Sequence, residues 1–161
     1  MTDLRTRVAR WLVDQEWQVE PGDVPGQLVL HPSDGPEPWP VIAVVLEEAA
    51  RVLVYSVLPE NVPEEARPRV AELLTRVNYG LLVGAMEIDL SDGEVRARTS
   101  VALGQAQPDD ATFGALMSQA VGGNLTLMDA VWGAVHEVAA GRTSPADAVR
   151  AVFGEPGTEH G

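Results

Sequence analysis

The 161-residue chain contains no cysteine and no lysine, and it has only three histidines. The lack of cysteine excludes disulfides, thiolate catalysis and cysteine-based zinc sites. All eleven basic residues are arginine, which, together with abundant Ala, Val and Gly, indicates a GC-rich bacterial genome. No apolar run approaches the roughly 20 residues that a membrane helix requires, and the opening segment MTDLRTRVARWLVD is charged where a signal peptide would be apolar. We therefore expect a cytoplasmic protein.

Positive charge is also scarce. The chain carries 24 Asp and Glu residues against 11 basic residues, a net charge of -13. Such a surface repels the phosphates of nucleic acids and the head groups of anionic lipids, so we expect neither nucleic acid nor membrane as a partner. The charge keeps the protein in solution and could steer a basic protein towards it.

The three histidines do not form a metal or catalytic motif. His31, His136 and His160 fall in a predicted strand, a predicted helix and the C-terminal tail. The segment HEVAA at His136 begins like a zinc-protease helix, but Ala140 stands where the second ligand should be. No nucleophile elbow, P-loop or dinucleotide-binding glycine motif is present. The sequence therefore predicts no catalytic residue, no metal ligand and no cofactor.

The carboxylates offer two alternatives to that interpretation, a calcium site and a catalytic acid. Asp89, Asp92 and Glu94 crowd one hairpin and could suggest calcium, yet no twelve-residue EF-hand loop surrounds them. A catalytic acid would need an apolar pocket around one carboxyl group. Glu47-Glu48 come nearest to this, and a turn explains them better. We interpret these acids as surface charges.

Hydrophobic periodicity and turn residues predict one α+β domain over residues 1–153, followed by a disordered tail over 154–161. The stretch 41–59 could be a buried helix, but its β-branched residues favour two strands joined at Glu47–Arg51. The expected elements are a helix over 3–15, strands over 16–20 and 27–31, two strands within 41–59, a helix over 61–80 capped by Asn61, a hairpin over 86–101, a long helix from 108 to 141 and a short helix over 144–153. This order predicts an antiparallel sheet covered on one face by helices.

The hairpin has the clearest local pattern. Met86, Ile88 and Leu90 alternate with acids, and after Asp92-Gly93 apolar residues alternate with arginines. A two-residue Asp-Gly loop favours a type I′ turn. It would set Leu90 opposite Val95, Asp89 opposite Arg96 and Glu87 opposite Arg98, with the arginines in solvent.

The long helix carries more apolar surface than one contact needs. Beside a first ridge runs a second, which includes Met117, Val121, Met128 and Trp132, and the combined arc exceeds the stripe of about 100° that covers one sheet. We take these four residues as a candidate protein interface, with Trp132 as an anchor that core packing would explain equally well. Gly122-Gly123, in the middle, predicts either a kink or the close approach of another backbone.

The stretch YSVLPENVPEEARPRVAELLTRVNYGLLVGAMEIDLSDGEVRARTSV resembles the YbjN-type domain family, whose fold is similar to that of type III secretion chaperones. The shared features are a strand ending at Pro59, a helix ending at Asn78, Gly84 before a strand, and the turn Asp92-Gly93-Glu94 followed by arginine-bearing alternation. The resemblance implies an α+β layer fold, frequent dimerisation and a chaperone-like or regulatory binding role. It supplies no catalytic residues.

These observations predict a non-enzymatic module that binds another protein, with a homodimer as one form. The alternative is a small-molecule binder or enzyme with a pocket between sheet and helices, for which Arg76, Arg96 and Arg98 are the basic residues to examine. A third alternative is a structural domain within a larger assembly.

Overall fold

The computed structural model describes residues 3–35 and 38–154. The predicted order of helices and strands is confirmed, and the predicted tail lies outside the described residues except for Gly154. The elements are α1 Leu4–Asp14, β1 Trp17–Pro21, β2 Gln27–Pro32, β3 Val41–Leu46, β4 Arg51–Val57, the 3-10 turn η1 Glu64–Ala66, α2 Arg67–Gly80, β5 Ala85–Ile88, β6 Val95–Ala102, α3 Asp110–Ala139 and α4 Pro145–Phe153.

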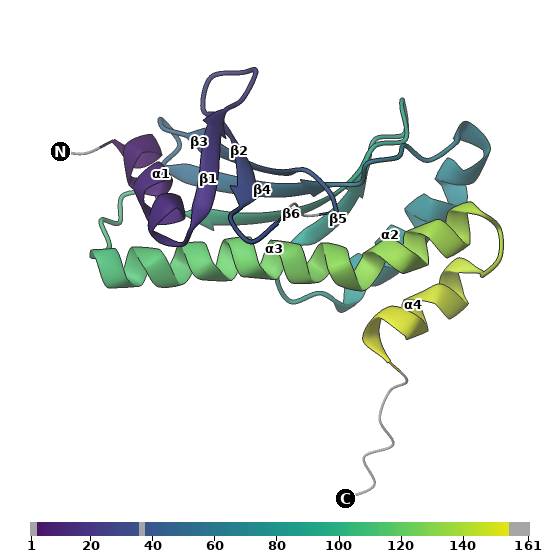
Figure 1. The fold of residues 1–161 in the computed structure, drawn as a ribbon. Coiled ribbons are helices and arrows are strands. Elements are labelled where there is room, and N and C mark those ends of the chain that lie inside the picture. Colours follow the sequence, from purple (N-terminus) through teal and green to yellow (C-terminus); the bar gives the residue numbers. More distant parts are fainter. Residues whose placement is uncertain (1–2, 36–37, 155–161) are drawn as a thin grey trace, which may run out of the picture.

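The strands form a six-stranded sheet in the order β1-β2-β3-β4-β6-β5. Every neighbouring pair is antiparallel. The helix α3 runs beneath the sheet along the direction of β4 and β6, with α1 at one end and α2 and α4 at the other (Figure 1). The expected sheet with helices on one face is therefore confirmed. Within the described residues, no helix is long and apolar enough to cross a membrane.

Three helices begin at capping side chains. Asp3 accepts a hydrogen bond from the backbone N–H of Thr6, and Asp109 accepts one from that of Thr112. Ser144 caps α4 in the same way. Each cap satisfies a backbone donor that the first turn of a helix leaves free. These residues fix the starts of α1, α3 and α4.

The start of α2 differs from the prediction. Asn61 does not cap it; its side-chain amide donates instead to the backbone oxygen of Asp92, 3.2 Å away. The turn η1 comes between, and α2 begins at Arg67 with Pro68 in its first turn. Because Pro lacks an N–H, it is tolerated in the first turn, where that donor would have no helical partner.

The hairpin between β5 and β6 has a longer loop than the two-residue turn predicted at Asp92-Gly93. Glu87 faces Arg96 and not Arg98, so the predicted register is wrong by two residues. An even shift leaves each strand residue on its predicted face, because successive side chains alternate between the faces. The exception is Leu90, which was expected inside and is 60% exposed in the loop.

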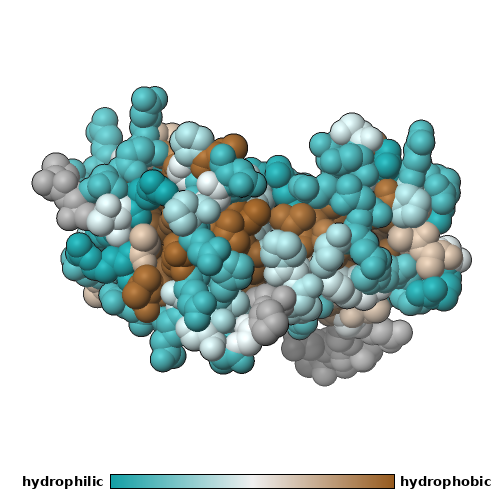
Figure 2. Space-filling model, turned by 45° about the horizontal axis from the view of Figure 1, so that its top comes forward, coloured by the Kyte–Doolittle hydropathy of each residue, from teal (hydrophilic) through white to brown (hydrophobic). Residues whose placement is uncertain are grey.

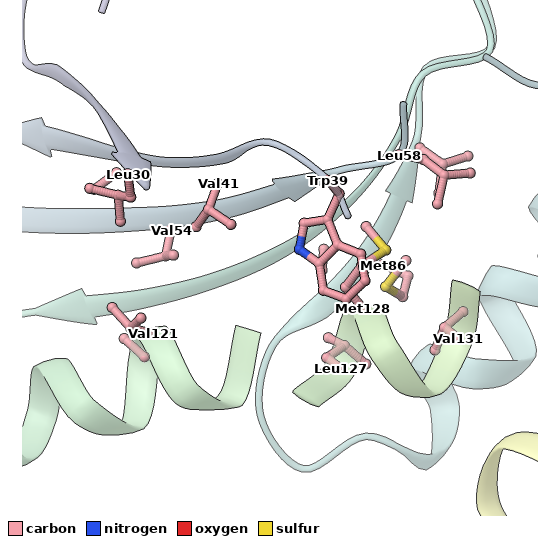
Figure 3. Close-up of a cluster of buried hydrophobic side chains, with 14 of the residues drawn as sticks. Leu30, Trp39, Val41, Val54, Leu58, Met86, Val121, Leu127, Met128 and Val131 are labelled. Atoms are coloured by element: carbon pink, nitrogen blue, oxygen red, sulfur yellow. The ribbon is translucent and has the colours of Figure 1, made fainter. Parts of the chain in front are cut away.

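The core lies between the sheet and α3, where apolar side chains from both sides meet (Figure 3). Val54 and Val41 point down from the sheet, and Leu127 and Met128 point up from the helix. Trp39 is only 6% exposed and is part of this core. The space in which a ligand pocket between sheet and helix would have to lie is therefore filled by side chains.

Candidate protein-binding surfaces

The structure contradicts the interface predicted on the long helix. Met117 and Met128 are fully buried, Val121 is 4% exposed, and all three belong to the core. The physical reason is that α3 contacts β4 and β6 and also packs against α2 and α4. Several neighbours need a wider apolar arc than one sheet does, so the second ridge is core and not a free surface.

The fourth predicted interface residue, Trp132, is only partly exposed. Its ring lies 5.4 Å from that of Trp39 and 5.3 Å from the imidazole of His136, with the imidazole edge-on. Such tilted and edge-to-face contacts are favourable arrangements for aromatic rings. Trp132 thus anchors the loop before β3 to α3, and the core interpretation of this residue fits the structure.

Gly122 and Gly123 neither break α3 nor receive another backbone. The helix is continuous from Asp110 to Ala139. Both glycines lie on its exposed side, and a Cβ added at either one would have no neighbouring atom within 4 Å. The predicted close approach is therefore not found among the described residues.

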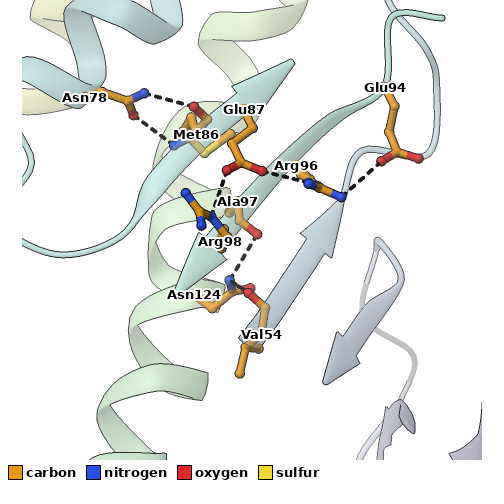
Figure 4. Close-up of polar contacts among 9 residues, drawn as sticks. All are labelled: Val54, Asn78, Met86, Glu87, Glu94, Arg96, Ala97, Arg98 and Asn124. Carbon is orange, nitrogen blue, oxygen red and sulfur yellow. Dashed lines mark hydrogen bonds and ion pairs between the residues drawn. The ribbon is translucent and has the colours of Figure 1, made fainter. Parts of the chain in front are cut away.

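A buried polar cluster joins α3 to the sheet. Asn124 has no exposed surface, and its amide donates to the backbone oxygens of Val54, at 2.8 Å, and Ala97, at 3.1 Å (Figure 4). Its side-chain oxygen accepts from the hydroxyl of Ser56 at 2.5 Å. Thr99 adds a bond to the backbone of α3. These bonds fix where α3 lies along β4 and β6.

The last turn of α2 and the loop that follows it before β5 expose large apolar side chains. Leu82 is 99% exposed, Tyr79 96% and Val83 75%. We call these three residues the apolar loop. Phe153, at the end of α4, is half exposed and lies against Gly80. Single exposed apolar residues are common, but three large ones within five residues are a candidate interaction site.

The apolar loop is held at both ends. On one side the Asn78 side chain accepts from the backbone N–H of Met86 at 2.8 Å and donates to its backbone oxygen at 2.9 Å (Figure 4). On the other side Gly84 has φ +78, and a Cβ there would lie 3.1 Å from the backbone oxygen of Arg98. Only glycine adopts this backbone and this approach without strain. The loop is therefore a clamped structure, and its exposed side chains are presented to solvent.

The second candidate surface is the sheet face opposite α3, which no helix covers within residues 3–35 and 38–154. We call it the open face. Its centre is apolar, and its strand residues alternate with the buried ones. They are Gln18, Glu20, Gln27, Val29, His31, Ile42, Val44, Leu46, Arg51, Leu53, Tyr55, Val57, Ala85, Glu87, Arg96, Arg98, Ser100 and Ala102. Figure 2 brings this side forward and shows a hydrophobic band between hydrophilic margins.

The charged groups of the open face gather at the β6 side. Glu87 pairs with Arg96 at 2.8 Å and with Arg98 at 2.7 Å (Figure 4). The Arg96 guanidinium also lies 4.4 Å from the centre of the Tyr55 ring, a cation–π distance. Burial opposes the charge on Arg96, but the hydrogen bond and the charge of Glu87 outweigh it and raise the pKa of Arg96. The cluster keeps Tyr55 in place beside the apolar centre.

The three arginines named for a ligand pocket do not share one site between sheet and helices. Arg76 pairs with Glu72 on the surface of α2, while Arg96 and Arg98 lie on the open face. Among the residues that the structure describes, no three His, Asp or Glu side chains gather as metal ligands would.

Sequence reasoning missed the apolar loop and its clamp. The only local signal is the apolar triplet Leu81–Val83 between Gly80 and Gly84, which lies between the predicted helix over 61–80 and the predicted hairpin over 86–101. Leu81 packs against the core, and the next two residues do not. Nothing in the triplet itself distinguishes the buried residue from the exposed ones.

Comparison with known proteins agrees with the resemblance seen in the sequence. The family model of YbjN, described as "Putative bacterial sensory transduction regulator", matches residues 4–131. A structure titled "Crystal structure of YbjN, a putative transcription regulator from E. coli" has a TM-score of 0.56 at 15% identity, over 75% of this chain and 85% of that chain. This similarity concerns the fold.

No curated protein matches the chain. The matching family is described as one of regulators and not as an enzyme family. Its model spans α1 to most of α3 and so includes the apolar loop and the open face, while α4 lies beyond it. Because the match covers well over half of the sequence, the chain belongs to the YbjN family.

Proposed function

We propose that this protein is a non-enzymatic regulator that works by binding another protein, and that the partner docks on the apolar loop. The observation that supports this most directly is the exposure of Leu82 and Tyr79, at 99% and 96%, on a loop fixed by the Asn78 clamp. Apolar side chains held in water have an unfavourable hydration that a partner would remove.

The shape of the loop indicates what kind of surface the partner offers. Side chains that are almost fully exposed protrude, so they would enter a concave apolar groove on the other protein. Burying an aliphatic or aromatic side chain contributes about 1.5–3 kcal/mol. Tyr79, Leu82 and Val83 could thus act as the central anchors of an interface, since a few such residues carry most of the binding free energy.

The clamp adds a second argument. Ordering a loop on binding costs free energy, and a loop that is already fixed avoids much of that cost. The two hydrogen bonds between Asn78 and Met86, and the packing of Gly84, fix the loop before a partner arrives. This is the arrangement expected of a preformed recognition element.

The test compares loop variants with a matched surface control. Affinity capture from the source organism, followed by mass spectrometry, names the partner, and calorimetry with the purified partner then measures affinity. Replacing Leu82 and Val83 by Ser should weaken binding about a hundredfold or more, because about 3 kcal/mol or more of apolar burial is lost. Val13 and Val24, also exposed, provide a control pair replaced by Ser that should bind normally.

Circular dichroism and the melting temperature should not change in the loop variant, because the replaced side chains support no core contact. If the named partner binds the loop variant as tightly as the wild type, the proposed docking site is wrong.

A further inference from the structure

We propose that two copies of this chain associate through the open faces of their sheets, about a two-fold axis that runs along β3. This inference rests on the proposed protein-binding role and adds another copy of the chain as a partner at a different surface. The evidence is the arrangement of charge and apolar side chains across the strands.

One row of side chains crosses the open face from β1 to β6. The strand register sets Glu20 beside Val29, Val29 beside Ile42, Ile42 beside Tyr55 and Tyr55 beside Arg98. The row therefore has an acid at one end, a base at the other and three apolar or aromatic side chains between them. Adjacent strands are about 4.8 Å apart, so Glu20 and Arg98 each lie about 10 Å from Ile42.

A two-fold axis parallel to β3 reverses this row in the second copy. Ile42 then faces its own counterpart, Val29 faces Tyr55 of the second copy, and Glu20 faces Arg98 of the second copy. Facing sheets cross at about 30°, which displaces the ends of the two rows by about 5 Å. The length of an Arg side chain spans such a displacement. The row is thus complementary to itself, as a two-fold interface requires.

The charges at the two ends are suited to this pairing. Arg98 shares the single carboxylate of Glu87 with Arg96, which also has Glu94 at 4.0 Å. The nearest basic group to Glu20 among the described residues is His31, at 3.7 Å. A second copy would supply Glu20 to Arg98 and Arg98 to Glu20, so each end gains an opposite charge in addition to the group that its own chain provides.

The open face also avoids most of the repulsion between two acidic chains. Its strand residues include three Arg and two Glu, in a chain with a net charge of -13. Association through this face keeps the strongly acidic surfaces outside. Six strands of about six residues span about 24 by 20 Å, so the two copies together would bury about 1,000 Å², near the lower limit for a specific interface. We therefore expect a weak dimer that dissociates on dilution.

Charge exchange at Glu20 and Arg98 tests the geometry. Sedimentation velocity of the wild type from about 1 to 200 µM should show a monomer–dimer equilibrium. Glu20→Arg alone and Arg98→Glu alone should each remain monomeric, because like charges face each other. An equimolar mixture of the two variants should recover the dimer, since every facing pair is then opposite in charge. Asp129→Arg, an equal charge change on the exposed side of α3, should dimerise like the wild type.

The outcomes separate this inference from the proposed function. A wild type that is monomeric at 200 µM, or single variants that dimerise normally, would overturn the open-face dimer while leaving partner binding by the apolar loop intact. A dimer lost on replacing Leu82 and Val83, but unaffected by the charge exchange, would also overturn it and would show that the apolar loop binds a second copy. Thermal melts of each variant verify that Arg98→Glu, which removes a contact with Glu87, still folds.

Discussion

The buried Asn124 should be the most sensitive polar position in the protein. It lies at the middle of α3 with no exposed surface and makes hydrogen bonds to Val54, Ala97 and Ser56. The Asn124→Ala variant removes these three hydrogen bonds at once. It also leaves the buried hydroxyl of Ser56 without the acceptor that it uses in the native protein.

The size of the effect follows from those contacts. A hydrogen bond contributes a net 0.5–1.5 kcal/mol, and an unsatisfied buried polar group costs about 1–3 kcal/mol. The Asn124→Ala variant loses three hydrogen bonds, and the hydroxyl of Ser56 must turn to a poorer partner. We therefore expect the free energy of unfolding to fall by about 3–4 kcal/mol. For a domain of this length, each kcal/mol lowers the melting temperature by roughly 2–4 °C. The variant should therefore melt about 6–16 °C below the wild type.

Urea unfolding followed by circular dichroism measures this change, with Gln119→Ala as the control. Gln119 is exposed on the same helix, so its replacement should alter the unfolding free energy by less than about 0.5 kcal/mol. A double-mutant cycle with Ser56→Ala and Asn124→Leu should give a coupling of about 1–2 kcal/mol, because removing both side chains of this pair leaves neither polar partner unsatisfied. If Asn124→Ala unfolds at the same urea concentration as Gln119→Ala, the polar cluster does not anchor α3.

Three further predictions concern other positions. The indole nitrogen of Trp39 is buried and has no hydrogen-bond partner among the described residues, so Trp39→Phe should stay within about 1 kcal/mol of the wild type in urea unfolding, while Trp39→Ala should cost about 3–5 kcal/mol. Asn78→Ala should speed hydrogen exchange at the Met86 amide at least tenfold, because that donor loses its acceptor. Hydrogen bonds from Thr6 and Thr112 lower the pKa of Asp3 and Asp109; their ionised forms therefore stabilise the fold above the ordinary carboxyl pKa, and this contribution is lost as pH falls through the lowered folded pKa. Melting temperatures of the Asp3→Asn/Asp109→Asn variant should consequently fall less steeply than those of the wild type from about pH 5 to pH 2.5.

Local signals in the sequence were enough to predict the elements and their faces. The caps of α1, α3 and α4 are short-range features that need only one side chain and a backbone three residues ahead. Strand alternation likewise depends only on the period of two. The order of the elements and the side of the sheet that each residue faces follow from such signals.

The loop of the hairpin shows where local signals fail. Asp92-Gly93 predicted a two-residue turn, but the backbone N–H of Gly93 donates to Asp89 at 2.7 Å and closes a longer loop. The segment before η1 also packs against Gly93, whose backbone carbonyl accepts a hydrogen bond from the backbone N–H of Val62 at 2.8 Å. A Cβ on Gly93 would lie only 2.1 Å from the Val62 oxygen. This glycine serves a contact with a segment thirty residues away, which no local turn preference contains.

The second ridge on α3 shows that local signals also fail to predict whether an apolar side chain is buried within the chain or free to bind a partner. Periodicity reveals that Met117, Val121 and Met128 share one side of a helix, but not how many neighbours that side meets. A helix between a sheet and two other helices hides an arc that would be a free surface if the helix met the sheet alone. A wide apolar arc on a helix therefore predicts that the arc is in contact with something. Only the tertiary structure shows whether that contact is made within the same chain.

The apolar loop is the opposite case, because its apolar side chains are exposed and not buried. Their exposure does not stabilise the monomer, so it indicates a function. Leu82 and Val83 could have been placed inwards by a different loop, which would have removed their unfavourable hydration. Instead, hydrogen bonds from Asn78 and the left-handed backbone of Gly84 fix the loop so that both side chains point into water. A clamp that keeps apolar groups exposed does not stabilise the monomer through those groups. Local interactions that hold an unfavourable arrangement are expected at functional sites, and this is the physical basis for our proposal that a partner binds the loop.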